Sequence, residues 1–371
     1  MSNIRKRLSN AIGWRTKRKI VVIESDDWGS IRTRSRNDYQ SMLAKGLNVD
    51  QSHFTKYDGL ESNTDLENLF ELLTKHKDST GRPAVFTPMC IMANPDFEKI
   101  KKSEFREYHY ENFVETCKKY PNHDRVFDLW REGIDERLFV PALHGREHLS
   151  VSRWMRELQN ENEGLRIAFE HQSFGVNSFK GKEIPEYLGA FHPDFSTDIH
   201  NLEKIIEIGV AMFKKTCGYE PTHFIAPNRE GPKEIDVKLA NLGVKVLTMS
   251  KLRHYPLGDE KYGREFNWMG KKNNLDQIMI TRNCHFEPSD PLHTDWVSSC
   301  LLEIENAFSW RKPAVISSHR VNFVGFINQD NADFGLKELN RLLSSITSKW
   351  PDIEFMTSTE LGNIIRESRI K

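Results

Sequence analysis

The chain has 371 residues, and its 53 lysines and arginines balance its 53 aspartates and glutamates, so the formal net charge is zero. A balanced charge argues against a general nucleic-acid binder, and no apolar stretch is long enough for a transmembrane helix. The five cysteines are odd in number and include no C-x-x-C pair. Reduced thiols and a cytoplasmic location therefore fit the composition best.

Residues 1–19 form a basic segment before the first expected strand. Ile4, Leu8 and Ile12 recur at helical spacing within it, so a short amphipathic helix is expected. The segment lacks the apolar core of a signal peptide. Two interpretations remain open, a solvated helix packed on the closed end of a barrel and a peripheral contact with a membrane surface. Its cations are Arg5, Lys6, Arg7, Arg15, Lys17, Arg18 and Lys19.

Short β-rich segments alternate with amphipathic segments through residues 20–371. The expected strands are 20–24, 84–91, 138–143, 222–226, 244–249, 276–281, 313–317 and 353–356. The expected helices are 64–76, 150–162, 197–216, 232–242, 291–310, 333–349 and 358–369. About eight strand–helix repeats favour an α/β fold, a distorted (β/α) barrel of seven or eight strands, over an open doubly wound sheet, which periodicity alone does not exclude. Residues 95–137 and 171–196 are expected to be inserted loops of this catalytic domain.

Asp26 and Asp27 follow the apolar strand that contains Ile20–Ile23. Two adjacent carboxylates repel one another, and a metal ion is a common remedy. Adjacent residues of a strand point to opposite sides, but the turn at Gly29 would allow both carboxylates to face inward. The alternative is that the pair caps a turn or helix.

Two further expected strands also end in histidines. His144 and His148 follow the strand at 138–143, and His319 follows the strand at 313–317. Asp27 with two histidines makes a three-ligand set that leaves positions open for water and substrate, as in catalytic zinc sites. Taken singly, the histidine pair could arise by chance, and His319 could be an ordinary loop residue. Polar groups at the ends of three strands are, however, typical of a barrel active site.

Together these motifs resemble the NodB-type polysaccharide deacetylases (carbohydrate esterase family 4), over roughly residues 20–360. The resemblance implies that Asp26 is the catalytic base, that Asp27, His144 and His148 bind a divalent metal such as zinc, and that His319 is the catalytic acid. It further implies that Asp295, in the segment His293-Thr294-Asp295-Trp296, orients His319.

The chain departs from the family pattern at three positions. Trp28 separates the aspartates from Gly29, and Gly145 replaces a Ser or Thr between the two histidines. Ile225 stands where the family has an arginine that pairs with the catalytic aspartate. Asn228 or Arg229 would be the nearest substitutes for that arginine.

Several other residues are candidates for substrate binding. Trp28 and Trp296 could stack on the apolar face of a sugar ring, although tryptophans in such positions also serve as core residues. His285 follows the sixth expected strand and could line the mouth of the site or belong to a capped loop. With Asn228 and Arg229, these residues complete the expected substrate-binding set.

The expected function is that of a zinc-dependent hydrolase removing an acyl group, N-acetyl above all, from an amino sugar. Metal choice is open, because Asp-His-His also accepts cobalt, nickel and iron. A cytoplasmic location favours a precursor of a surface polysaccharide as the carbohydrate substrate. Two alternatives are a metal-dependent hydrolase acting on a non-sugar amide and a non-catalytic carbohydrate-binding protein that keeps the fold.

Overall fold

A nine-stranded parallel sheet forms the centre of the computed structural model, which describes residues 10–176, 178–183, 186–292 and 295–368. Eight strands follow the order β12-β9-β8-β5-β2-β1-β14-β13, and β15 pairs with β1 beside this row. Their bounds are Lys19–Trp28 (β1), Phe86–Ile91 (β2), Ala142–Gly145 (β5), His223–Phe224 (β8), Val246–Thr248 (β9), Ile278–Ile280 (β12), Cys284–His285 (β13), Ala314–His319 (β14) and Ile353–Met356 (β15). Each strand expected from the sequence is present, and β13 is an additional one.

The sheet is curled, as the short connection between its two outer strands demonstrates. β12 and β13 stand at opposite ends of the strand order, yet only residues 281–283 connect them. A connection of that length spans at most ~14 Å. The two ends of the sheet must therefore approach one another. Since no ladder joins β12 to β13 among the described residues, the barrel stays incomplete, with a seam between them. The distorted (β/α) barrel predicted from the sequence is confirmed.

Asn283 joins the connection between β12 and β13 to the beginning of β14. Its side-chain amide donates to the Pro313 carbonyl at 3.0 Å, and its side-chain oxygen accepts from the Val315 N–H at 2.8 Å. These bonds satisfy backbone groups at the start of β14 that a full neighbouring strand would otherwise pair. The same connection carries Arg282 into the barrel interior.

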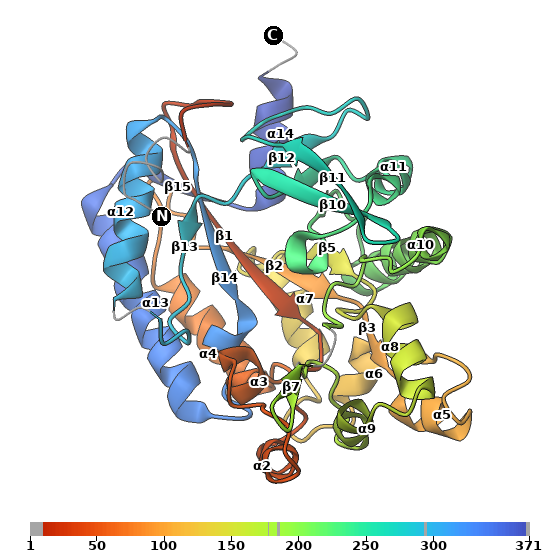
Figure 1. Ribbon diagram of the computed structural model, residues 1–371. Helices are drawn as coiled ribbons and strands as arrows, with labels where there is room; N and C mark the ends of the chain where they lie inside the picture. Colours follow the sequence, from red (N-terminus) through yellow and green to blue (C-terminus); the bar gives the residue numbers. More distant parts are fainter. Residues whose placement is uncertain (1–9, 177, 184–185, 293–294, 369–371) are drawn as a thin grey trace.

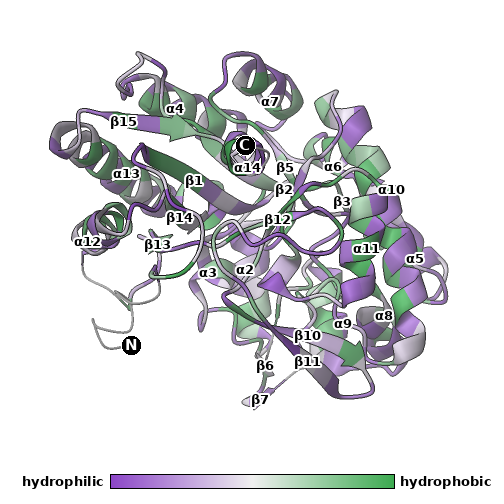
Figure 2. Ribbon diagram, turned by 90° about the horizontal axis from the view of Figure 1, so that it is seen from above, coloured by the Kyte–Doolittle hydropathy of each residue, from purple (hydrophilic) through white to green (hydrophobic). Residues whose placement is uncertain are grey.

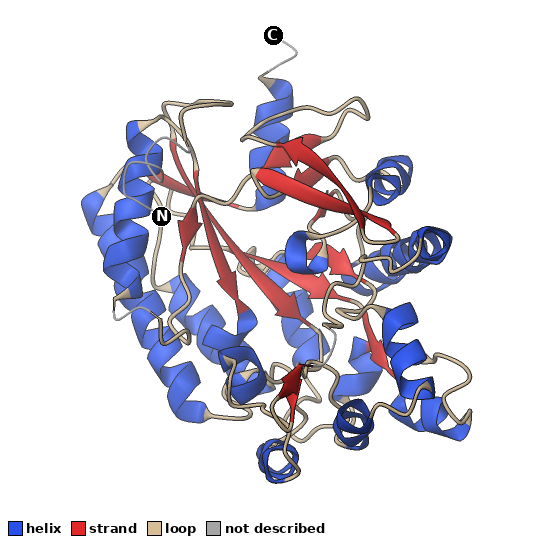
Figure 3. Cartoon of the chain, viewed as in Figure 1, coloured by secondary structure: helices blue, strands red, loops and turns tan. Residues whose placement is uncertain are grey.

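Helices surround the strands, as Figures 1 and 3 show. The principal ones are α4 (Asn63–Thr74), α7 (Val126–Asp135), α8 (Val151–Gln159), α10 (Ile199–Cys217), α11 (Lys233–Asn241), α12 (Trp296–Ser309), α13 (Gln329–Lys349) and α14 (Ser358–Glu367). Several have the side-chain caps that their sequences allow: Ser62 and Asp65 form a capping box on α4, and Thr357 and Glu360 form one on α14. Gly218, with φ of 81°, ends α10.

Apolar side chains fill the space between the sheet and these helices. β1 is buried along nearly its whole length, in agreement with its four β-branched residues Ile20–Ile23. Figure 2 shows the hydrophobic strands in the middle of the molecule and mixed hydrophilic and hydrophobic helices around them. This packing fixes the carboxyl ends of the strands, where the candidate site residues lie.

The two stretches expected to be inserted loops contain short elements of their own. Residues 95–137 include α5 (Phe97–Lys102), β4 (Tyr110–Asn112), α6 (Phe113–Cys117) and α7, and residues 171–196 include the hairpin of β6 (Ser178–Phe179) and β7 (Lys182–Glu183). The remaining short elements are α2 (Arg36–Ala44), α3 (His53–Tyr57), α9 (Glu163–Glu170), β3 (Ala93–Pro95), β10 (Leu252–Gly258), β11 (Lys261–Phe266), η1 (Ser196–Asp198), η2 (Pro227–Arg229) and η3 (Arg320–Asn322).

Most of the expected N-terminal amphipathic helix lies outside the described residues, which begin at residue 10. At the described end of this basic segment, Arg18 pairs with Glu354 at 2.6 Å and Lys19 with Asp352 at 2.7 Å. The first pair joins the segment to β15 and the second joins it to the residue just before β15. Among the described helices, none is long and apolar enough to cross a membrane.

Candidate metal and proton-transfer site

A bulge at the end of β1 directs its two carboxylates to different partners. The pairing of β1 with β2 shifts register between Ser25 and Trp28, and Asp27 has a φ of 79°. A non-glycine residue in this left-handed region is uncommon and carries strain of order 1 kcal/mol or more. The bulge turns Asp27 toward β5, while Asp26 remains paired in register with His319 on β14. The turn that allows both carboxylates into the site thus begins at Asp27 itself, before Gly29.

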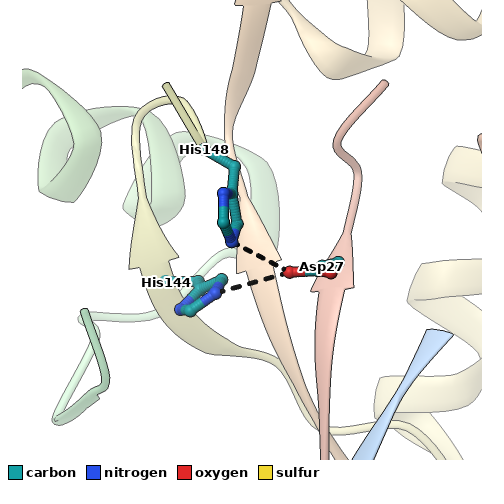
Figure 4. Close-up of side chains that lie close together, drawn as sticks. All are labelled: Asp27, His144 and His148. Carbon is teal, nitrogen blue, oxygen red and sulfur yellow. Dashed lines mark ion pairs between the residues drawn. The ribbon is translucent and has the colours of Figure 1, made fainter. Parts of the chain in front are cut away.

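Asp27 converges with His144 and His148, as Figure 4 shows. The Asp27 Oδ1 atom lies 3.7 Å from His144 Nε2 and 3.1 Å from His148 Nε2. One ligand atom from each residue lies within 4.8 Å of the other two, and all three side chains are buried. The structure therefore brings together the three residues predicted to bind metal.

The chemistry of this donor set fits a divalent transition metal. The Ile225 carbonyl lies 2.8 Å from His144 Nδ1, which favours the tautomer with Nε2 unprotonated and turned toward Asp27. Burial lowers the pKa of His148 to about 4 despite the neighbouring Asp27 carboxylate, so this imidazole is neutral, as a ligand must be. Two imidazole nitrogens and one carboxylate oxygen suit zinc and its neighbours.

Arg282 holds Asp26 through both carboxylate oxygens. Its Nη2 and Nη1 atoms donate to Asp26 Oδ1 at 2.5 Å and to Oδ2 at 2.7 Å, and its Nε donates to Glu24 at 2.6 Å. Burial alone would raise the pKa of Asp26, but the Arg282 charge and hydrogen bonds outweigh it and lower that pKa to about 2. Asp26 is therefore ionised at neutral pH.

Arg282 also corrects one expectation from the sequence. Neither Asn228 nor Arg229 supplies the arginine that is missing at Ile225. Asn228 is exposed and donates to Glu186, and Arg229 is exposed as well. The replacement comes instead from the seam of the barrel, directly after the sixth expected strand. A charged residue at the end of an apolar strand was the signal that could have identified it.

Glu287 occupies the position beside His319 that the sequence assigned to Asp295. The Glu287 Oε1 atom lies 2.5 Å from His319 Nδ1, while His319 Nε2 lies 3.7 Å from Asp26 Oδ2. Burial alone would lower the pKa of His319, but the charges of Glu287 and Asp26 raise it to about 9. His319 is therefore protonated at neutral pH and faces the ionised Asp26.

Asp295 has a different role in the fold, so its expected contact with His319 is wrong. It is the N-cap of α12: its side chain accepts from the Ser298 N–H at 3.0 Å and pairs with Arg341 at 3.2 Å. An aspartate just before a helix is often used in this way. His293 and Thr294, which precede it in the quoted motif, lie outside the described residues.

A cleft of about 540 Å³ adjoins the proton-transfer pair. Arg282 and Glu287, the partners of Asp26 and His319, form part of its wall. Three predicted substrate-binding residues, Arg229, His285 and Trp296, also line it. The other lining residues are Thr248, Met249, Ser250, Lys251, Asn283, Ser299, Glu303 and Asn306. A volume of this size holds a small organic ligand or a few sugar units.

Trp28 is a core residue, contrary to its predicted contact with substrate. Its side chain is fully buried, its indole N–H donates to Ser25 Oγ at 2.9 Å, and its ring packs edge-on against Phe139 at 4.9 Å. The extra residue between the aspartates and Gly29 therefore anchors the end of β1 in the core. Asn228 is absent from the cleft lining, in contrast to its neighbour Arg229.

The chain is similar in structure to several solved proteins. No protein-family model and no curated protein sequence matches the chain. A solved structure described as a probable polysaccharide deacetylase from Pseudomonas aeruginosa aligns over 94% of this chain and 90% of its own, with 8% identity and a TM-score of 0.45. One assigned as a polysaccharide deacetylase from Mycobacterium smegmatis aligns over 97% and 94%, with 11% identity and a TM-score of 0.43. A mutant of a pseudoenzyme of carbohydrate esterase family 4 aligns over 93% and 67%, with 9% identity and a TM-score of 0.37.

Asp26 and Asp27, His144 and His148, and His319 come from the ends of three strands and meet at one edge of an incomplete (β/α) barrel. The motifs in which the chain resembles the NodB-type polysaccharide deacetylases thus form one continuous site.

Proposed function

We propose that this protein is a metal-dependent hydrolase that removes an acyl group, in particular N-acetyl, from an amino sugar. The observation that carries the proposal is the juxtaposition of two sets of groups. Asp27, His144 and His148 form a buried three-ligand set, and next to it an ionised Asp26 faces a protonated His319. Amide hydrolysis needs an electrophilic centre, a base for water and an acid for the leaving amine.

Asp27, His144 and His148 would hold the metal ion. When bound, the metal would supply Lewis acidity, which polarises the amide carbonyl and makes water a better nucleophile. All three residues sit on the β1 and β5 side of the site, so the scissile carbonyl would lie there. The leaving nitrogen would then face β14.

Asp26 would accept the proton of the attacking water. Arg282 holds both of its oxygens, so the carboxylate keeps one orientation before and after the proton moves. His319, kept protonated by Glu287, would donate its Nε2 proton to the departing amine. The water proton thus passes to Asp26 and the His319 proton to the leaving nitrogen, and the products are a carboxylic acid and a free amine.

The cleft beside Arg282 and Glu287 would bind the remainder of the substrate. Its polar side chains, including Ser299 and Asn306, offer hydrogen-bond partners for hydroxyl groups, and Trp296 offers an aromatic surface. This combination suits a carbohydrate better than a small aliphatic amide. A precursor of a surface polysaccharide is the substrate class that we propose.

A direct test is release of acetate from a panel of N-acetylated amino sugars, sugar nucleotides and oligosaccharides by zinc-loaded protein. Simple amides without a sugar serve as the comparison panel. Release from the sugar substrates that Asp26→Asn abolishes would support the proposal. Hydrolysis of the simple amides alone would assign the site to a non-sugar amidohydrolase. No hydrolysis of either panel, together with binding of the sugars, would make the protein a carbohydrate-binding one.

A further inference from the structure

Arg32 makes a direct contact with the candidate metal ligand Asp27. Its Nη2 atom donates to Asp27 Oδ2 at 3.0 Å, and both side chains are almost fully buried, with 4% and 3% of their surface exposed. The other carboxylate oxygen, Oδ1, faces His144 and His148. The two oxygens of Asp27 therefore have different partners, a cation on one side and the metal-binding histidines on the other.

Among the described residues, Asp27 is the sole hydrogen-bond acceptor for the Arg32 side chain. Within the described parts of the chain, the buried Nε and Nη1 atoms of Arg32 have no hydrogen-bond partner. Asp58, the next carboxylate, lies 3.7 Å from Nε and is held by Arg320 through both of its oxygens at 3.1 Å. Release of Asp27 would leave a buried guanidinium without a hydrogen bond, which is costly. The Arg32–Asp27 contact is therefore expected to persist when a metal binds.

The wider network reduces the negative charge available to a metal. Two guanidinium groups, Arg32 and Arg320, lie among three carboxylates, Asp27, Asp58 and Glu61. With all five ionised, one net negative charge remains. A divalent cation would thus add two positive charges to a buried region where a guanidinium already shares its ligand, and charge repulsion is strong in such surroundings.

We propose that Arg32 confines Asp27 to one metal-binding oxygen and weakens the affinity of the Asp27, His144 and His148 site for divalent cations. Hydrogen bonds to a ligand usually strengthen metal binding by orienting the ligand. Here the donor also carries a full positive charge beside the site, and the repulsion outweighs the gain from orientation. The consequence is a metal that exchanges readily rather than one that is permanently bound. This inference rests on the proposed function only in its use of the metal site.

The test is the zinc dissociation constant, measured by competition with a chromophoric chelator in the absence of substrate. Arg32→Gln and Arg32→Met both remove the charge, and we expect each to bind zinc roughly tenfold more tightly than wild type, a change of the size that groups contacting metal ligands produce. Arg34→Gln is the matched control, because Arg34 is two residues away, 46% exposed, and 4.0 Å from Asp38. Its zinc affinity should equal that of wild type.

Equal or weaker zinc binding by folded Arg32→Gln and Arg32→Met would overturn the inference. His144→Ala in the wild-type background shows whether zinc binds at the proposed site. If zinc binding does not depend on His144, the metal centre itself fails and the proposed function fails with it. If it does depend on His144 but not on Arg32, only this inference fails.

A measurement on the wild-type protein covers the case in which neither variant folds. The crystal structure of the zinc-loaded protein should show Asp27 bound through Oδ1 alone, with Arg32 still hydrogen-bonded to Oδ2. Zinc coordinated by both oxygens, with Arg32 displaced, would contradict the proposal.

Discussion

Asp26 and Asp27 are neighbours in the chain, yet their carboxylates have different hydrogen-bond partners. Arg282 engages both oxygens of Asp26, whereas Arg32 engages one oxygen of Asp27 and leaves the other beside two histidines. The bulge at the end of β1 separates the two environments by turning Asp27 toward β5.

This difference suits two distinct tasks. A carboxylate that must receive a proton in one fixed direction benefits from a partner on both oxygens, which keeps it ionised and oriented. A carboxylate that must bind a metal needs one oxygen without a hydrogen-bond donor. Substitutions on the two sides should therefore separate metal binding from proton transfer.

Removal of two metal ligands should have the largest effect on zinc content and on hydrolysis. His144→Ala/His148→Ala removes two of three ligands, so bound zinc should fall from about one equivalent to none, and hydrolysis should fall with it. Plasma mass spectrometry of protein equilibrated with zinc during purification measures the metal content. His200→Ala, which replaces a histidine with 72% side-chain exposure, is the control and should keep its zinc. Full zinc content in the double variant would place the metal elsewhere.

Loss of the proposed base should strongly reduce turnover without changing the affinity for zinc. In Asp26→Asn the side chain cannot accept a proton, so we expect kcat to fall by about 10²–10⁴-fold, with an unchanged zinc dissociation constant. Asp295→Asn is the matched control. Because asparagine also caps helices and Asp295 does not contact His319, this variant should keep wild-type activity. Activity retained in Asp26→Asn would refute the assigned base.

The sequence could predict those residues of the site that carry a recognisable motif at the end of an apolar strand. Asp27, His144 and His148 were predictable because each follows an apolar strand, and parallel strands bring their carboxyl ends together. The partners Arg282 and Glu287 were missed. Arg282 follows the sixth expected strand, but its contact with Asp26 depends on closure of the whole sheet, which places the seam beside β1 and β14. Glu287 follows β13, a two-residue strand with no periodic signal.

The same reasoning explains why Asp295 and Trp28 were misassigned. A helix cap and a catalytic partner are both aspartates at the end of a loop, and only the position of α12 distinguishes them. Trp28 directly follows Asp26 and Asp27, but the bulge turns its side chain into the core. The order of strands and helices could thus be predicted from periodicity, whereas the direction of individual side chains could not.

Removal of Arg282 should mainly cost stability. Arg282→Met leaves Asp26 and Glu24 buried without their shared cation, which we expect to lower the free energy of unfolding at neutral pH by about 3–5 kcal/mol. Urea denaturation followed by circular dichroism measures this difference. Arg229→Met is the control, since Arg229 is exposed and should change stability by less than about 0.5 kcal/mol.

The difference in stability between wild type and Arg282→Met should also depend on pH. The pKa of Asp26 in the folded protein is about 2, below its ordinary value of about 3.9. A depressed carboxyl pKa stabilises the fold above the ordinary value, and this contribution disappears as the pH falls from about 4 to about 2. The stability gap between wild type and Arg282→Met should therefore narrow over that range. A gap that stays constant would mean that Arg282 acts through packing alone.

Substitution of Glu287 should give the smallest effect, a displacement of the pH profile. His319 must be protonated to act as an acid, and its pKa is raised to about 9, with Glu287 the strongest of the groups that raise it. Wild-type kcat/KM should therefore fall as the pH rises through about 9. In Glu287→Gln the raising charge is lost, so the decline should begin at lower pH, toward the ordinary histidine value of about 6.5. Below that value the two proteins should differ little, because His319 is protonated in both.

The matched control is Glu303→Gln, which changes another carboxylate of the same cleft, one that contacts His285. This variant should leave the pH profile of kcat/KM unchanged. If Glu287→Gln lowers activity equally at every pH, Glu287 orients His319 without setting its protonation, and the two sides of the site would then differ in geometry alone.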